Sequence, residues 1–239
     1  MWGLRKQWQR KWVVALCAIA FASHSSAQVL SRLGSISSEP PGSQAILEGN
    51  WVYSLTPQKL LLVLEVGSSL TKRAVLPLPS GREQASAIAK SGNFVYIAND
   101  PMVSGAPYLT VVDVSNPASP TVVADIAMPS STPTITRIVV NGNYLYMFPY
   151  SGDMRIVSVA NPSAPVFVRS VSMSASDGVV VGNRLYTAEG TSGLGIWDIS
   201  QPDNPARVGS LSLSGTIMRV QVSGNTLYAL SDVLSLIHI

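Results

Sequence analysis

Residues 142–146 read Gly-Asn-Tyr-Leu-Tyr, and this short stretch has four relatives in the same chain. Each relative begins with Gly-Asn and reaches a tyrosine three residues after the asparagine; they are Gly49–Tyr53, Gly92–Tyr96, Gly182–Tyr186 and Gly224–Tyr228. The spacings along the chain are 43, 50, 40 and 42 residues. A Gly-Asn pair readily adopts positive φ at both positions, as a tight primed turn between antiparallel strands requires. Each copy therefore predicts a β-hairpin.

Around each hairpin the apolar residues alternate with a period of two, which predicts further strands. First strands precede the turn, as in Ile135–Val140 and Met218–Val222. Third strands are predicted at Leu60–Val66, Leu109–Val114, Met154–Val159 and Leu194–Ile199. Proline-containing turns follow, as in Asn116-Pro117 and Asn161-Pro162, and lead to fourth strands at Ala74–Leu78, Val122–Ile126, Val166–Val171 and Val208–Leu211. Proline presets φ for such a turn.

Four short strands in a unit of about 42 residues are the size and content of one β-propeller blade. We therefore predict an all-β fold, a β-propeller of about five four-stranded blades, over residues 28–239. The predicted blades span 38–78, 79–126, 127–171, 172–212 and, in part, 213–239. Arg32–Ser37 matches Arg207–Ser212 nearly position by position. We interpret it as an orphan fourth strand that closes the last blade and covers its edge.

The N-terminus has the three regions of a secretory signal peptide. Four basic residues lie in the first eleven, an apolar run from Trp12 to Ala22 follows, and Ser25-Ser26-Ala27 supplies small residues before a predicted cleavage after Ala27. Removal of residues 1–27 changes the net charge from +3 to −1, so the basic pI belongs to the signal. We therefore predict an exported protein (periplasmic, cell-surface or secreted) with no transmembrane helix in the mature chain. Cys17 is lost with the signal, which leaves no cysteine for a disulfide.

Two stretches resemble a known family. Leu109–Pro117, which reads LTVVDVSNP, and Ala188–Pro202, which reads AEGTSGLGIWDISQP, look like the LVIVD-repeat propellers of bacterial and archaeal surface proteins. The resemblance covers about residues 32–233 and is weak in the first blade, where Glu65 replaces the aspartate. It implies a propeller fold with a binding or scaffolding role, and it names no catalytic residues.

The last six residues, Leu234–Ile239, allow two interpretations. They align with Leu194–Ile199, which predicts a third strand for the fifth blade with His238 where Asp198 stands. The same hexapeptide also resembles the translation of a transposon end sequence used to prepare sequencing libraries. We favour the second interpretation, under which the chain is an open-reading-frame fragment with an incomplete last blade.

The composition excludes several kinds of catalytic site. After signal removal the only histidine is His238, so a Ser-His-Asp triad, a cysteine nucleophile and a zinc site built on His or Cys lack their parts. No basic aromatic stripe indicates nucleic acid. We expect no metal and no cofactor. Carboxylate chemistry stays open, because a glycosidase needs only two carboxylates about 5–10 Å apart and calcium needs only oxygen ligands.

Residues that recur at one blade position favour structural roles. Asp113 and Asp198 share a position, which predicts a turn or an inter-strand hydrogen bond. The repeated tyrosines could stack on sugars, but their regular spacing favours packing between blades. Residues 99–108 form an insertion in one blade only, and loops that depart from a repeat often carry function.

Propeller ligands commonly bind at one mouth of the central channel, on loops that join second to third strands and fourth to first strands. The candidates there are Arg82, Asp100, Tyr108, Arg137, Tyr150, Asp153 and Glu189. We predict a non-catalytic binding or scaffold propeller with a protein or carbohydrate ligand at the exported or cell-surface side. The alternatives are a lyase, lactonase or glycosidase with carboxylate or calcium chemistry, and a non-functional gene fragment.

Overall fold

The computed structural model describes residues 44–56, 58–80, 84–100, 107–129, 134–232 and 236–238. Within these ranges the regular structure consists of nineteen β-strands in five antiparallel sheets. The first two sheets contain β1 (Gln44–Glu48), β2 (Trp51–Leu55), β3 (Leu60–Val66) and β4 (Leu70–Pro77), then β5 (Gln84–Ser91), β6 (Phe94–Asp100), β7 (Tyr108–Asp113) and β8 (Thr121–Ala127).

The remaining three sheets repeat the pattern. They contain β9 (Ile135–Asn141), β10 (Tyr144–Pro149), β11 (Met154–Ser158) and β12 (Val166–Val171); β13 (Asp177–Val181), β14 (Arg184–Ala188), β15 (Leu194–Asp198) and β16 (Ala206–Leu211); and β17 (Ile217–Ser223), β18 (Thr226–Ser231) and β19 (Leu236–His238). Within each sheet the strands lie in chain order. The predicted strand runs are confirmed, with ends that differ by a few residues.

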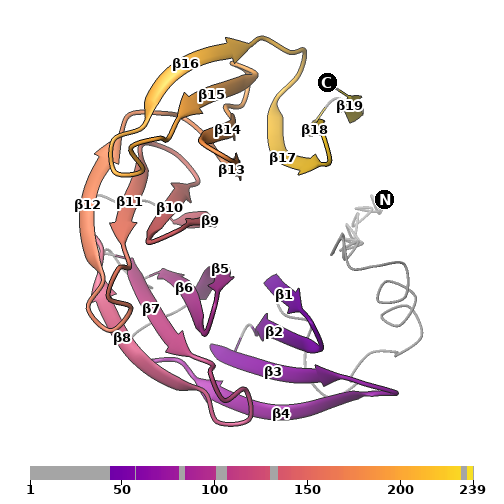
Figure 1. Cartoon of the computed structure of the whole chain (residues 1–239), viewed down its shortest axis with the longest axis vertical. Coiled ribbons are helices and arrows are strands. Elements are labelled where there is room, and N and C mark those ends of the chain that lie inside the picture. The colour runs from indigo at the N-terminus through magenta and orange to yellow at the C-terminus, as the bar shows by residue number, and fades with distance from the viewer. Residues whose placement is uncertain are drawn as a thin grey trace, which may run out of the picture.

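The five sheets follow one another around an arc, as the blades of a propeller do (Figure 1). The first strands, β1, β5, β9, β13 and β17, lie nearest the centre, and β4, β8, β12 and β16 form the outer rim. The predicted all-β propeller architecture is confirmed. Each sheet is one blade, numbered one to five in chain order below.

The Gly-Asn hairpins differ from the prediction in one dihedral angle. Gly142 has φ of +55°, and the other four glycines of the turns have φ between +53° and +58°. The asparagines were predicted to share positive φ, and this was wrong, because the one non-glycine residue with positive φ among the described residues is Lys59. Positive φ at the first central position alone is the pattern of a type II′ turn. The backbone carbonyl of Asn143 accepts a hydrogen bond from Val159 N at 2.7 Å, and Asn50, Asn93 and Asn183 make the equivalent bond.

Short polar side chains close the turns between third and fourth strands. Asp113 Oδ1 accepts a hydrogen bond from Ser115 N at 2.7 Å, and Asp198 Oδ1 accepts one from Ser200 N at 2.8 Å. These bonds lower the pKa of both carboxyls, and that of Asp198 falls to about 2. The turn role predicted for this position is confirmed.

Four hydrophobic clusters form the core, one between each pair of neighbouring blades. Successive residues of a strand face opposite neighbours, so Leu145 packs toward blade two and Tyr146 toward blade four. Tyr146 is fully buried, and its hydroxyl donates a hydrogen bond to the Pro202 carbonyl of blade four at 2.9 Å. Tyr53 and Tyr96 are also buried between blades, as predicted for the repeated tyrosine.

Blade five has three described strands. β19 is a third strand, as one interpretation of the tail predicted, but its register differs from that alignment by two residues. His238 pairs with Tyr228, as Ile196 pairs with Tyr186, so it does not stand at the position of Asp198. The reason is loop length. In blade four, five residues separate the paired residues Ala188 and Leu194, and in blade five, five residues separate the paired residues Leu230 and Leu236. The predicted signal peptide and the orphan strand Arg32–Ser37 lie outside the described residues.

Substitution of the turn glycine tests the hairpin geometry. A Cβ at Gly142 would meet no atom within 4 Å, so the cost of Gly142→Ala comes from its positive φ alone. We expect a loss of about 1–3 kcal/mol in the free energy of unfolding, measured by urea denaturation. Gly67→Ala is the control, because Gly67 lacks positive φ and its Cβ would lie 3.8 Å from the nearest atom. Equal losses in the two variants would contradict this account.

Candidate functional site at the channel mouth

The first strands of blades three, four and five place three charged residues at one level. Arg137 is opposite Phe148, Asp177 is opposite Ala188, and Arg219 is opposite Leu230. These second-strand partners occupy equivalent positions, so the three charged residues form a row across neighbouring blades, called the charged row below. The Gly-Asn hairpins lie at the other end of the same strands. The row therefore lies at the mouth where second strands lead to third strands.

Asp177 is the buried centre of the charged row. Its side chain is 4% exposed, and Arg137 Nε lies 3.1 Å from its Oδ1 as an ion pair. Oδ2 accepts a hydrogen bond from Val220 N of blade five at 3.0 Å, whereas Oδ1 has no hydrogen-bond partner among the described residues. Burial raises the pKa of Asp177, and the charges of Arg137 and Arg219 act against this shift. One carboxylate thus attracts arginines of both neighbouring blades.

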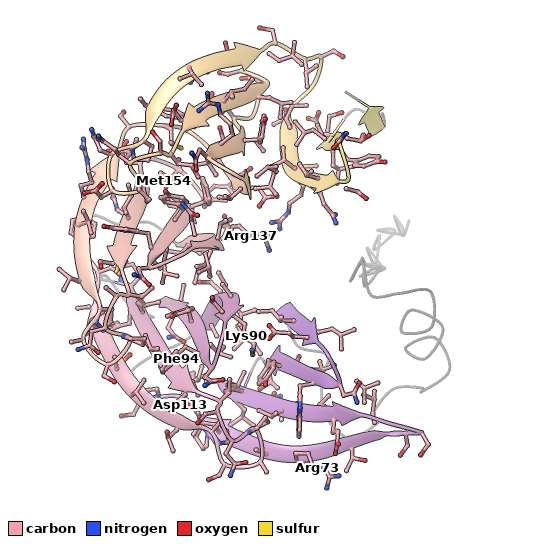
Figure 2. The ribbon with its side chains drawn as sticks, viewed as in Figure 1. Arg73, Lys90, Phe94, Asp113, Arg137 and Met154 are labelled. Carbon is pink, nitrogen blue, oxygen red and sulfur yellow. The ribbon has the colours of Figure 1, made fainter. Side chains whose placement is uncertain are left out.

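The arginines of the charged row remain accessible. The Arg137 side chain is 44% exposed and Arg219 is exposed. Figure 2 shows Arg137 extending from β9 toward the open centre of the arc. In the part of the chain that the structure describes, neither arginine donates a hydrogen bond from its side chain. Their guanidinium groups therefore present donors to the channel.

Hydroxyl groups join the first strands next to the charged row. The Thr136 hydroxyl is shared between two acceptors, the Phe148 carbonyl at 3.2 Å and the Ser176 carbonyl at 3.3 Å, and Ser176 Oγ donates a hydrogen bond to the Met218 carbonyl at 3.1 Å. Each residue of this chain directly precedes a member of the charged row. The bonds hold neighbouring blades together and satisfy carbonyls at their inner edges.

Glu189 lies in a buried network inside blade four. Its Oε1 accepts hydrogen bonds from Thr187 Oγ1 at 2.9 Å and from Trp197 Nε1 at 3.2 Å, and its Oε2 lies 2.9 Å from Arg207 Nη2. Gly195 makes room for this carboxylate, because a Cβ there would overlap Glu189 Oε1 and Thr187 Oγ1. Both oxygens of Glu189 are thus used within the blade.

Blades two and three have polar groups at the same level as Glu189. In blade two Asn99 Nδ2 donates to Thr110 Oγ1 at 2.7 Å, and Thr110 Oγ1 donates to Asp125 Oδ1 at 2.8 Å. In blade three the buried Arg155 donates to Ser170 Oγ at 2.6 Å. These bonds join strands of one blade and support the mouth from within.

The residues predicted for the site fall into three groups. Arg137 belongs to the charged row, and Tyr150 and Asp153 lie in the following β10–β11 loop, where Tyr150 is 79% exposed. Glu189 is buried, and Tyr108 begins β7 and is partly exposed. Asp100 ends β6, and Arg82 lies outside the described residues.

Sequence reasoning missed Asp177 and Arg219. The available signal was the spacing within the row. Asp177 follows Arg137 by 40 residues, and Arg219 follows Asp177 by 42. These are the distances between the corresponding Gly-Asn turns, so aligning the repeats on those turns finds the row.

Two features are absent from the described ranges. They contain no group of three or more His, Cys, Asp or Glu side chains placed to hold a metal ion. They also contain no helix that is long and apolar enough to cross a membrane.

Solved structures with similar folds define the class of protein. The β-propeller domain of Cps50 (Swd1) from Myceliophteria thermophila superposes with a TM-score of 0.59 at 13% identity, covering 77% of this chain and 64% of that one. BamB from Moraxella catarrhalis gives 0.50 at 14% identity, with coverage of 78% and 66%. The computationally designed Ika8 protein gives 0.57 at 14% identity, with coverage of 77% and 54%. The chain is a β-propeller that spans about half to two thirds of the length of these structures.

A family model refines this class. The LVIVD repeat matches residues 83–128, 135–173 and 174–212, which together make up more than half of the chain. The chain belongs to the LVIVD-repeat family, and the matches fall on blades two, three and four. No curated protein sequence matches the chain.

The fit between Gly195 and Glu189 can be tested by a double-mutant cycle. We expect Gly195→Ala to lower the free energy of unfolding by about 1–3 kcal/mol, because the new Cβ overlaps the buried carboxylate. In a Glu189→Ala background the same change should cost less, since the overlapping oxygen is gone. Gly209→Ala is the control in the same sheet, because its Cβ would make ordinary contacts with Ile196. An unchanged cost in the double variant would refute the assigned contact.

Replacement of Asp177 by asparagine tests the effect of its burial on stability. The unfolded carboxyl titrates near 3.8 and the folded pKa is higher, so above about pH 4 the folded protein binds more protons and loses stability as the pH rises. We expect Asp177→Asn to gain stability relative to the wild type as the pH rises from about 4. Urea denaturation across this range measures the trend.

Asp198→Asn should show the opposite sign. The folded pKa of Asp198 is about 2, so its carboxylate stabilises the fold above the unfolded pKa and this stabilisation is lost as the pH falls toward 2. The variant should therefore lose stability relative to the wild type as the pH rises from about 2 to 4. Parallel trends in the two variants would be inconsistent with the assigned directions.

Proposed function

We propose that the mature protein is an exported binding or scaffold propeller, which holds a protein or carbohydrate partner at the channel mouth and catalyses no reaction itself. The basic N-terminal residues, the apolar run and Ser25-Ser26-Ala27 support export. The observation that carries the binding role is the charged row, in which Arg137 and Arg219 present guanidinium donors from the first strands of separate blades. Arginine forms strong, directional bonds to anionic groups.

The surroundings of Glu189 and Asp177 favour binding over carboxylate catalysis. Both oxygens of Glu189 are used inside blade four. The groups that shift the pKa of Asp177 are its burial, two arginines and two backbone N–H groups, and they include no second carboxylate. A glycosidase pair needs two carboxyl groups that act on one bond.

The purified mature chain, residues 28–239, provides the test. We expect no turnover of aryl glycosides, lactones or acidic polysaccharides above the buffer rate, and binding to immobilised cell-envelope polysaccharide or protein that the double variant Arg137→Ala/Arg219→Ala loses. Arg73→Ala is the control for loss of an arginine away from the mouth, because Arg73 lies on the outer rim, where it pairs with Glu65 (Figure 2). Turnover that Asp177→Asn abolishes would overturn the proposal, as would binding that the double variant retains.

A further inference from the structure

We propose that the channel mouth binds a uronic acid residue of an acidic saccharide, whose carboxylate is held by Arg137 and Arg219 and whose ring packs on Tyr150. This inference rests on the proposed binding function and names the ligand class. Three features of the described residues support it: the two exposed arginines, the exposed aromatic side chain and the occupied inner edges of the blades.

The two arginines of the charged row favour a carboxylate ligand. The charged row contains two arginines and one aspartate, so it carries a net charge of +1 in a mature chain whose sequence charge is −1. Asp177 is a positioning residue here, because its buried carboxylate attracts both arginines while the outer faces of their guanidinium groups stay open. A ligand carboxylate would accept the paired donors that each guanidinium offers.

Tyr150 supplies a surface suited to a sugar ring. It lies two residues beyond Phe148, the register partner of Arg137, and its backbone N–H donates to the Thr134 carbonyl at 2.7 Å. The backbone is therefore anchored at the start of β9 while the side chain is 79% exposed. The other large side chains of this part of blade three, Phe148 and Met154, are fully buried. An exposed aromatic side chain in the loop that follows the register partner of Arg137 matches a ligand with an apolar ring face and a carboxylate.

The inner edges of the blades argue against a peptide added as a strand. A peptide that pairs with a sheet edge needs free backbone donors and acceptors along that edge. At this level the carbonyls of Ser176 and Met218 accept hydrogen bonds from Thr136 and Ser176, and Val220 N donates to Asp177. A ligand at the mouth therefore meets side chains and not a free strand edge. This favours a saccharide over an acidic peptide that binds as an added strand.

Isothermal titration of the mature chain with oligogalacturonate and oligoalginate tests this inference. We expect at least one of the two to bind, and its methyl ester to bind at least about tenfold more weakly because the carboxylate charge is gone. Arg137→Ala and Arg219→Ala should each weaken binding about tenfold, and Tyr150→Ala about fivefold. Arg73→Ala should bind like the wild type.

Thermal unfolding of each variant separates a lost contact from a lost fold. Arg219→Ala is the more informative arginine variant, because Arg219 makes no side-chain hydrogen bond or ion pair with another described residue. Equal binding of the methyl ester, or no binding of either oligosaccharide, would overturn the inference. Tighter binding of hexaglutamate that is insensitive to Tyr150→Ala would also overturn it. That last result would leave the proposed binding function standing if Arg137→Ala abolished the binding.

Discussion

The contact between the faces of neighbouring blades is the interaction on which the rest of the structure depends. A single four-stranded sheet with apolar residues on both faces cannot bury them alone, so each blade needs a neighbour on either side. Leu145 and Tyr146 show the result, since adjacent residues of one strand pack into different clusters. Each such fully buried side chain contributes about 1.5–3 kcal/mol. Repetition of this contact turns a linear array of blades into an arc.

The same stacking produces the channel mouth. First strands that are distant in the chain come together at the centre, and their polar residues then pair between blades. Thr136 and Ser176 bond to carbonyls of the next blade, and Asp177 receives a backbone N–H from blade five and a guanidinium from blade three. The site is therefore a consequence of blade packing. Its residues lie on rigid strands, which favours a preorganised recognition surface.

Hydrogen bonding distinguishes two buried acidic residues near the mouth. Glu189 is fully satisfied within blade four by Thr187, Trp197 and Arg207, and it supports the strand ends. Asp177 is also buried but retains one oxygen without a hydrogen bond, directed at an exposed arginine. Both could be proposed from the repeat, yet only their surroundings distinguish a structural carboxylate from one that positions binding groups.

The sequence by itself determined the blades. Period-two alternation, Gly-Asn hairpins and Asn-Pro turns are local signals, and they located the strands, the turn role of Asp113 and Asp198 and the packing of the repeated tyrosine. Only the tertiary structure decided the register of β19, the burial of Glu189 against Gly195 and the pairing of Asp177 with Arg137 and Val220 of neighbouring blades. These features depend on loop length, on space left by a missing side chain and on contacts between residues about one blade apart. Such contacts exist only after the blades have packed.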